Sequence, residues 1–148
     1  METDIQKITR KTGRKPISCK CKLCKQQCTV VSCLGTPSDI EKIIDAGFKD
    51  RIRETEWLAG VVLKVVDQSI LMFQPNYDEE KKCCTFFKDG LCELHDLGLK
   101  PTEGKLSHHS YKVDNFVAKK SVTWNVAKEW LNPDNSCTIS RIIKKLES

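Results

Sequence analysis

The sequence predicts a small α+β protein: a single domain, residues 1–148, with metal-bound cysteine loops, short antiparallel hairpins and several packed helices. Three observations support this class. The chain has 148 residues, enough to bury one hydrophobic core. Runs of β-branched residues lie in the middle of the chain, and helical apolar spacing occurs on both sides of them. Two cysteine clusters also interrupt regular patterns. We expect the cysteine-cluster core over 19–110 and C-terminal helices over 118–147.

Two helices are predicted in the first third of the chain. Residues 2–12 alternate charged and apolar side chains up to Gly13, so they form either a short helix or a frayed tail. A second helix begins where Ser38 and Glu41 have the spacing of a capping box, and Gly47 is placed to end it. Its apolar face consists of Ile40, Ile43, Ile44 and Phe48.

A first hairpin is predicted in the middle of the chain. The charged residues 49–56 indicate a bridge after the second helix. The runs 61–66 and 69–74 are rich in β-branched and aromatic side chains, and only two residues separate them. We therefore expect these two runs to be paired strands.

A second hairpin is predicted over 84–94. Asp89 and Gly90 form the strongest short turn signal in the chain. A tight turn at this position is expected to bring Cys84 and Cys92 near each other.

The last third of the chain is predicted to be helical. Residues 121–131 and 136–146 carry apolar side chains three and four positions apart, and Asn132 and Pro133 separate the two segments. The side chains expected to face the core are Val122, Val126 and Trp130 in the first segment, and Ile139, Ile142, Ile143 and Leu146 in the second.

The cysteine pattern predicts a metal site. Five of the nine cysteines lie between residues 19 and 33, and three more lie between 83 and 92. Cys21 and Cys24 have two residues between them, a spacing that lets both sulfurs bind one zinc ion. We expect 19–33 to be irregular where it wraps a metal, and the two clusters to converge. The predicted ligands are Cys21, Cys24, Cys28, Cys33, Cys84, Cys92, His108 and His109, with at least one of the two histidines used.

Three further donors are left open. Cys19 is either a ligand or a free surface thiol. Cys83 precedes Cys84 directly, and neighbours along a strand point to opposite sides, so at most one of them reaches a given site. His95 follows Cys92 by three residues, a spacing compatible with a shared metal.

Charge and composition indicate which partners and which cellular compartment to expect. The net charge of +5 could indicate a polyanion partner, but no aromatic and basic motif for nucleic acid accompanies it. Lysines between the cysteines can instead offset thiolate charge around zinc. No apolar run is long enough to cross a membrane, and the N-terminus has no secretory signal pattern. We expect a cytoplasmic protein with reduced thiols, which argues against disulfides.

The order of these motifs resembles the YkgJ family of cysteine-cluster proteins, described as zinc- or iron-chelating domains. The resemblance covers roughly residues 19–105. Two positions depart from the family pattern: Gly104 stands where a cysteine is expected, and His95 replaces a tyrosine. The matching positions are Cys21, Cys24, Cys28 and Cys33 (the last two at wider spacing), then Pro37, Asp39 and Ile40, then Cys84, Phe86, Gly90, Cys92 and Leu94, with Lys100 and Pro101 in place of Arg-Pro.

The sequence predicts a metal-binding protein and leaves its biochemical role open. Zinc is the expected metal. The alternative is iron or a [4Fe-4S] cluster in an oxidoreductase or its accessory protein, which the resemblance also implies; its ligands would be Cys21, Cys24, Cys28 and one of Cys84 or Cys92. A thiol enzyme using Cys24 or Cys33 beside His109 is a third class, disfavoured because such a site needs one activated cysteine rather than a cluster. A protein partner is left open.

Overall fold

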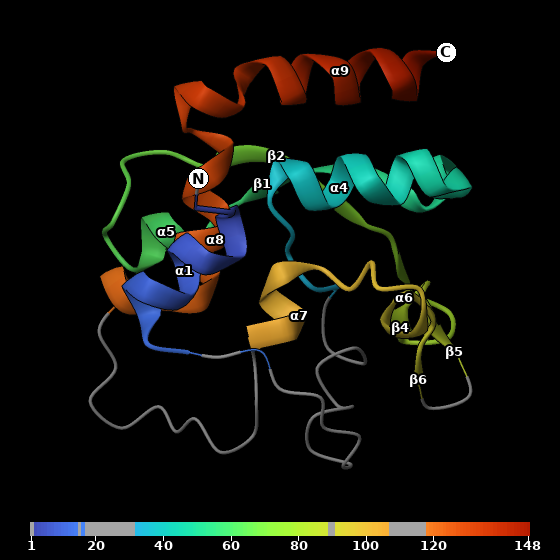
Figure 1. Cartoon of the computed structure of the whole chain (residues 1–148), viewed down its shortest axis with the longest axis horizontal. Helices are drawn as coiled ribbons and strands as arrows, with labels where there is room; N and C mark the ends of the chain where they lie inside the picture. Colours follow the sequence, from blue (N-terminus) through green and yellow to red (C-terminus); the bar gives the residue numbers. More distant parts are fainter. Residues whose placement is uncertain (1, 15, 17–31, 89–90, 107–117) are drawn as a thin grey trace.

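A computed structural model of the chain describes residues 2–14, 16, 32–88, 91–106 and 118–148. Within these segments, short helices surround a two-stranded antiparallel ribbon, and two shorter strand pairs lie at one side (Figure 1). The predicted α+β class is confirmed. No helix in the described segments is both long and apolar enough to cross a membrane.

The N-terminal segment is a helix, α1 (Asp4–Thr12), and not a frayed tail. Thr3 and Gln6 form a capping box at its start. Gly13 ends it with a positive φ of 73°, a conformation that glycine adopts without steric cost. Ile8 is fully buried and attaches the helix to the core.

The second helix, α4 (Pro37–Ile43), forms as predicted, but its cap is Thr36 with Asp39 rather than Ser38 with Glu41. The reason is Pro37, which occupies the first helical position, so that the cap is Thr36, two residues before the predicted Ser38. Ile40, Ile43 and Ile44 are buried as expected. A π turn, η1 (Ile44–Phe48), follows; Gly47 leaves helical geometry there at φ 99°, and the short η2 (Lys49–Arg51) comes next.

The central ribbon differs from the predicted first hairpin. Strand β2 (Ile70–Pro75) is confirmed, but its partner is β1 (Ile52–Trp57), within the stretch expected to be a charged bridge. The run 61–66 does not form a strand, because the chain turns back as α5 (Ala59–Val62). Gly60 permits this turn: a Cβ there would lie 2.4 Å from the Trp57 ring.

Two short strand pairs carry the second cysteine cluster. Strand β3 (Tyr77–Asp78) pairs with β4 (Cys83–Cys84), and β5 (Phe87–Lys88) pairs with β6 (Leu91–Cys92). The second predicted hairpin is confirmed by the β5–β6 pairing, whereas its turn residues 89–90 lie outside the described residues. The two strands of this hairpin differ from the prediction in one respect, because Cys84 does not belong to them. Cys92 pairs with Phe87, whereas Cys84 pairs with Tyr77 in the other strand pair.

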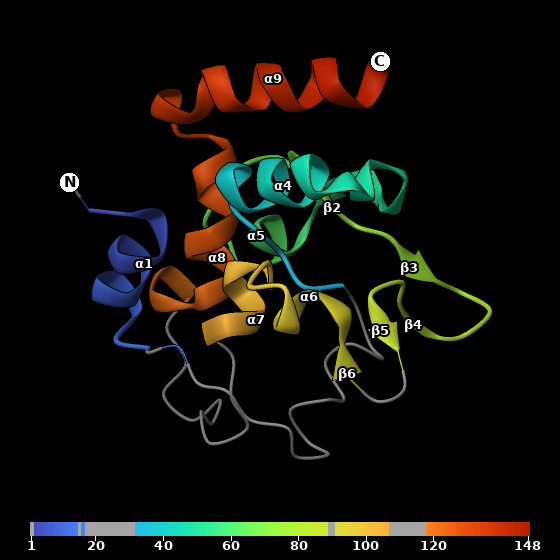
Figure 2. The ribbon, with the colours of Figure 1, turned by 45° about the vertical axis from the view of Figure 1, so that its right-hand side comes forward.

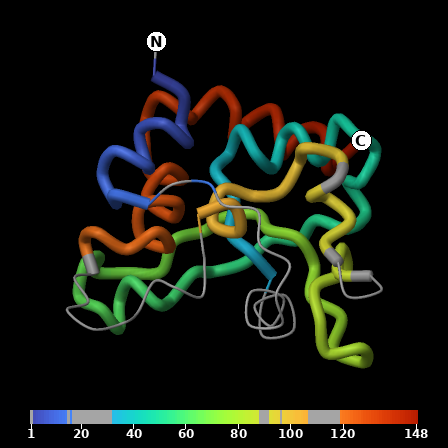
Figure 3. The backbone as a smooth tube through the Cα atoms, turned by 60° about the horizontal axis from the view of Figure 1, so that its bottom comes forward, coloured from blue at the N-terminus to red at the C-terminus, as the bar shows by residue number. Residues whose placement is uncertain are grey.

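The C-terminal helices are confirmed. Ser121 caps α8 (Val122–Ala127), and α9 (Ser136–Glu147) lies alongside α4, as both Figure 1 and Figure 3 show. Ile142 is fully buried as predicted. Ile143 is 40% exposed, so the prediction that it faces the core is wrong. The elements are α6 (Glu93–Asp96), α7 (Thr102–Leu106), η3 (Ala118–Lys120), α8 (Val122–Ala127), η4 (Lys128–Trp130), η5 (Pro133–Asn135) and α9 (Ser136–Glu147).

One hydrophobic cluster joins elements from α1 to α9. Aromatic contacts link the ribbon to the C-terminal helices: Trp57 stacks on Trp124 at 6.1 Å between ring centroids, and Phe73 meets Trp130 at 6.0 Å. In the turned view of Figure 2, α4 and α9 lie on one side of this core, while α7, β5 and β6 lie on the other. None of the described cysteines of the two clusters lies on α9.

Candidate metal centre

The structure describes three of the predicted ligands: Cys33, Cys84 and Cys92. Among the described residues, no group of three or more Cys, His, Asp or Glu side chains has the arrangement of a metal site. The convergence of the two clusters therefore stays a prediction. The remaining predicted ligands, Cys21, Cys24, Cys28, His108 and His109, lie outside the described residues, and so does the open position Cys19.

Cys33 lies in an extended stretch, residues 32–36, here called the Cys33 segment. Hydrogen bonds from distant elements hold its backbone. The Leu34 amide donates to Glu103 Oε1 at 3.0 Å, and the Leu34 carbonyl accepts from the Glu103 amide at 3.1 Å. Trp130 Nε1 donates to the Gly35 carbonyl at 2.9 Å. The backbone next to Cys33 is thus fastened to both α7 and η4.

Asp39 joins the far end of this segment to α7. Its Oδ2 accepts from the Thr36 amide at 3.0 Å, which is one half of the α4 capping box. The same oxygen accepts from the Thr102 amide at 2.9 Å and from the Thr102 hydroxyl at 2.5 Å. One carboxylate therefore caps α4 and fixes the first residue of α7 against it.

Gly104 lies directly against the Cys33 sulfur. A Cβ built on Gly104 would lie 3.1 Å from Cys33 Sγ and 3.0 Å from Lys100 Cε. This is the position at which the YkgJ pattern expects a cysteine. A cysteine there would stand beside Cys33.

Glu103 occupies a polar niche between the Cys33 segment and α8. Burial raises the pKa of Glu103, and the hydrogen bonds from the Leu34 amide and the Thr123 hydroxyl oppose that rise. Thr123 Oγ1 donates to Glu103 Oε2 at 2.7 Å. Each carboxylate oxygen thus accepts a hydrogen bond, and the side chain acts as a bridge between two elements.

The second group, here called the hairpin cysteines, consists of Cys83, Cys84 and Cys92. Cys83 and Cys84 are buried on β4, and Cys92 is half-buried at the end of β6. Cys83 Sγ lies 3.9 Å from the Phe87 carbonyl oxygen, within hydrogen-bonding range for sulfur. His95, the open histidine, is also half-buried, on α6 directly after β6.

Aromatic and charged contacts support the hairpin cysteines from the core side. Phe86 is fully buried and meets Phe48 edge to face, with 5.4 Å between ring centroids. The Arg51 guanidinium lies over both rings, at 5.4 Å from Phe48 and 5.1 Å from Phe86. Arg51 also forms an ion pair with Glu93 at 2.7 Å, which ties η2 to the residue after Cys92.

A polar hollow of about 200 Å³ lies beside β4. Charges of both signs line it, and the Asp78 carboxylate accepts the amides of Glu80 and Lys81 at 3.0 and 3.1 Å. Both cysteines of β4 contribute to its wall. The full lining is Arg51, Asp78, Lys81, Cys83, Cys84, Thr85, Phe87 and Glu93.

The residues that hold the Cys33 segment were missed as site residues. Glu103 was not singled out, and Asp39 entered only as part of the family-like helix start. Their contacts join positions 69 and 63 residues apart in the sequence. No local pattern predicts such pairs.

No family model matches the chain, and neither a curated protein nor a solved structure matches it. The resemblance to the YkgJ family thus stays a prediction that rests on the order and spacing of the sequence motifs.

Proposed function

We propose that the protein binds zinc through its clustered cysteines, and that the metal joins the segment 19–33 to the hairpin cysteines. The observation that carries this proposal is the fastening of Cys33. Its backbone is hydrogen-bonded to α7 on the following residue, and its sulfur packs against Gly104. Metal ligands need such support, because a donor must be held in place to bind with useful affinity.

The donor chemistry favours zinc. Thiolates bind zinc at about 2.3 Å, and four of them complete a tetrahedral structural site. In the proposed cytoplasmic environment the thiols remain reduced and available. Cys33, Cys84 and Cys92 would hold the metal together with donors from the predicted set outside the described residues. When bound, structural zinc contributes on the order of 10–16 kcal/mol to folding, comparable with the stability of a whole domain.

A donor exchange between Cys33 and Gly104 tests the proposal. Cys33→Ser removes a thiolate that we propose binds the metal. Loss of a residue that only supports a ligand lowers metal affinity by roughly 10- to 100-fold, and loss of the ligand itself should lower zinc affinity by more. Adding Gly104→Cys to Cys33→Ser returns a sulfur close to the original one, because a Cβ at 104 would lie 3.1 Å from the original Sγ. We expect the double variant to recover much of the lost affinity, measured by competition with a chromophoric zinc chelator.

Two controls isolate the sulfur. Cys33→Ser with Gly104→Ala fills the same space without a donor and should not recover binding. Cys137→Ser removes an exposed thiol on α9, outside both clusters, and should bind zinc like the wild type. Wild-type affinity in Cys33→Ser, or equal recovery by alanine and cysteine at 104, would contradict the proposal. Stoichiometric iron in place of zinc, with visible absorbance, would favour the iron–sulfur alternative.

A further inference from the structure

We propose that Glu103 is a positioning residue that fixes Cys33 for metal binding before the ion arrives. This inference rests on the proposed function and extends it from the ligands to the residues that hold them. Glu103 engages Leu34 twice, through its own amide and through its carboxylate. Both polar backbone groups of the residue after Cys33 are therefore bound to one residue of α7.

The hydrogen bonds that Glu103 makes, here called the clamp, extend to a third element, α8. Glu103 Oε2 accepts from Thr123 on α8, so the carboxylate cannot turn away from Leu34 without losing that bond. The next residue of α7, Gly104, borders the Cys33 sulfur so closely that an added Cβ would lie 3.1 Å from it. Adjacent residues of one short helix therefore hold the backbone beside Cys33 and limit the space around its thiol.

The second carboxylate, Asp39, keeps α7 in register with this arrangement. It binds both the amide and the hydroxyl of Thr102, the residue before Glu103, while it caps α4 through Thr36. The Cys33 segment is consequently held at Leu34 by Glu103 of α7, and at Thr36 by Asp39 of α4, which itself binds Thr102 of α7. A donor held at two points loses little conformational freedom when the metal binds, which raises affinity without any new contact to the metal.

Substitutions at Glu103 separate positioning from direct coordination. Glu103→Ala removes the carboxylate bonds to the Leu34 amide and the Thr123 hydroxyl, keeps the backbone bond to the Leu34 carbonyl, and should lower zinc affinity by roughly 10- to 100-fold, as changes around metal ligands do. Glu103→Gln keeps an oxygen for the Leu34 amide and presents an amide to the Thr123 oxygen. We therefore expect glutamine to restore affinity close to the wild type. If glutamine fails like alanine, the carboxylate charge matters and the positioning role is wrong.

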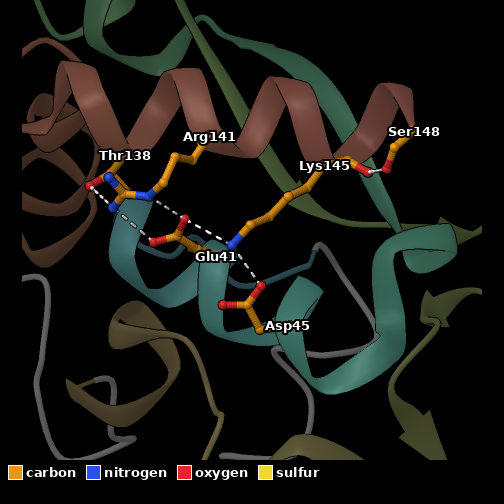
Figure 4. A network of polar contacts seen from close by, with 6 residues as sticks. All are labelled: Glu41, Asp45, Thr138, Arg141, Lys145 and Ser148. Carbon is orange, nitrogen blue, oxygen red and sulfur yellow. Dashed lines mark hydrogen bonds and ion pairs between the residues drawn. The ribbon is translucent and has the colours of Figure 1, made fainter.

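Glu41→Ala is the matched control. Glu41 also loses two bonded partners on substitution, because it accepts from Arg141 at 2.8 Å and from Lys145 at 3.1 Å (Figure 4). These contacts join α4 to α9, whereas the Glu103 contacts join α7 to the Cys33 segment and α8. Zinc affinity in Glu41→Ala should match the wild type; an equal loss in both alanine variants would reduce the Glu103 effect to general destabilisation.

Amide hydrogen exchange in the metal-free protein tests the positioning independently of zinc. The Leu34 amide should be protected in the wild type and in Glu103→Gln, and should exchange faster in Glu103→Ala. A Leu34 amide that exchanges rapidly in the metal-free wild type would overturn the inference. If Glu103→Ala does not fold, Thr123→Val removes only the outer hydrogen bond and should give a smaller loss of affinity and of protection; no loss in either measurement would overturn the inference.

The two proposals fail in distinguishable ways. Absence of zinc binding by the wild type, with a protected Leu34 amide, would refute the proposed function while the clamp remained as a structural feature. Tight zinc binding that Glu103→Ala leaves unchanged would refute the positioning role while the metal function remained.

Discussion

The Cys33 segment and the hairpin cysteines are held in different ways. Two carboxylates fasten the Cys33 segment: Glu103 binds Leu34 across 69 positions of sequence, and Asp39 joins Thr36 to Thr102 of α7. Strands of two residues carry the hairpin cysteines, and their support from the core includes the buried Phe86 ring, the Arg51 guanidinium above it and the Arg51–Glu93 ion pair. The first arrangement depends on hydrogen bonds between distant elements, and the second on two-residue strand pairs packed against the core.

In our proposal, the two regions therefore contribute differently to a shared metal site. Hydrogen bonds fix direction, so the Cys33 segment is the better preorganised of the two. Strand pairs of two residues are marginal on their own, so the hairpin depends on the core and, in our proposal, on the metal. We expect removal of zinc to loosen the hairpin cysteines before it loosens the Cys33 segment.

Truncation of Phe86 should produce the largest effect. Phe86→Ala removes a fully buried ring, its contact with Phe48 and its contact with the Arg51 guanidinium. Such changes cost about 3–5 kcal/mol, which should appear as a lower midpoint in chemical denaturation of the metal-free protein. The hairpin thiols should then react faster with a thiol reagent, while the Leu34 amide keeps its protection in the folded state.

Ile142→Ala provides the comparison for that variant. Ile142 is also fully buried, but it lies on α9, away from β4–β6 in Figure 1. Its loss of stability should be about 2–5 kcal/mol without selective exposure of the hairpin thiols. Equal thiol reactivity in the two variants would show that the hairpin has no separate dependence on Phe86.

The pH dependence of stability should give a smaller effect with a defined sign. Burial raises the pKa of Glu103 in the folded protein above its ordinary value of 4.5. The stabilisation from its proton is fully present below pH 4.5 and is lost as the pH rises through the folded pKa. In the metal-free protein, the stability of the wild type relative to Glu103→Gln should therefore fall as the pH rises above 4.5, as measured by denaturation at several pH values.

Glu41 should show the opposite sign. Its hydrogen bond with Arg141 lowers the pKa of Glu41, with Lys145 contributing further. The stabilisation is present above pH 4.5 and is lost as the pH falls through the folded pKa. Relative to Glu41→Gln, the wild type should lose stability on acidification. The same sign for Glu41 and Glu103 would contradict the contrast between a surface ion pair and an enclosed carboxylate.

Local signals in the sequence were sufficient for α4, α8 and α9. Apolar spacing and the residues at the ends predicted these three helices and left α1 open between a helix and a frayed tail, although Pro37 moved the α4 cap to Thr36. Strand β1 was missed because most of its side chains are charged or exposed, and its structure depends on pairing with β2. The run 61–66 has strand-like composition, but the close packing of Gly60 on Trp57 turns the chain as a helix.

Less of the candidate site than of the helices could be predicted from the sequence. Cysteine spacing predicted the donors, since metal ligands recur at short and regular intervals. The carboxylates that hold Cys33 could not be identified in this way. Glu103 has no distinctive neighbours in the sequence, and its role arises from contacts with residue 34 and with α8. Long-range polar contacts of this kind follow from the packing of α7, which no local pattern specifies.

Elemental analysis of anaerobically prepared protein, combined with thermal unfolding before and after metal removal, tests the central claim most directly. The account predicts stoichiometric zinc, a marked fall in the unfolding temperature when the ion is removed, and reactive hairpin thiols in the stripped protein. A chain that carries no metal, has nine reactive thiols and is as heat-resistant after chelation as before would contradict it.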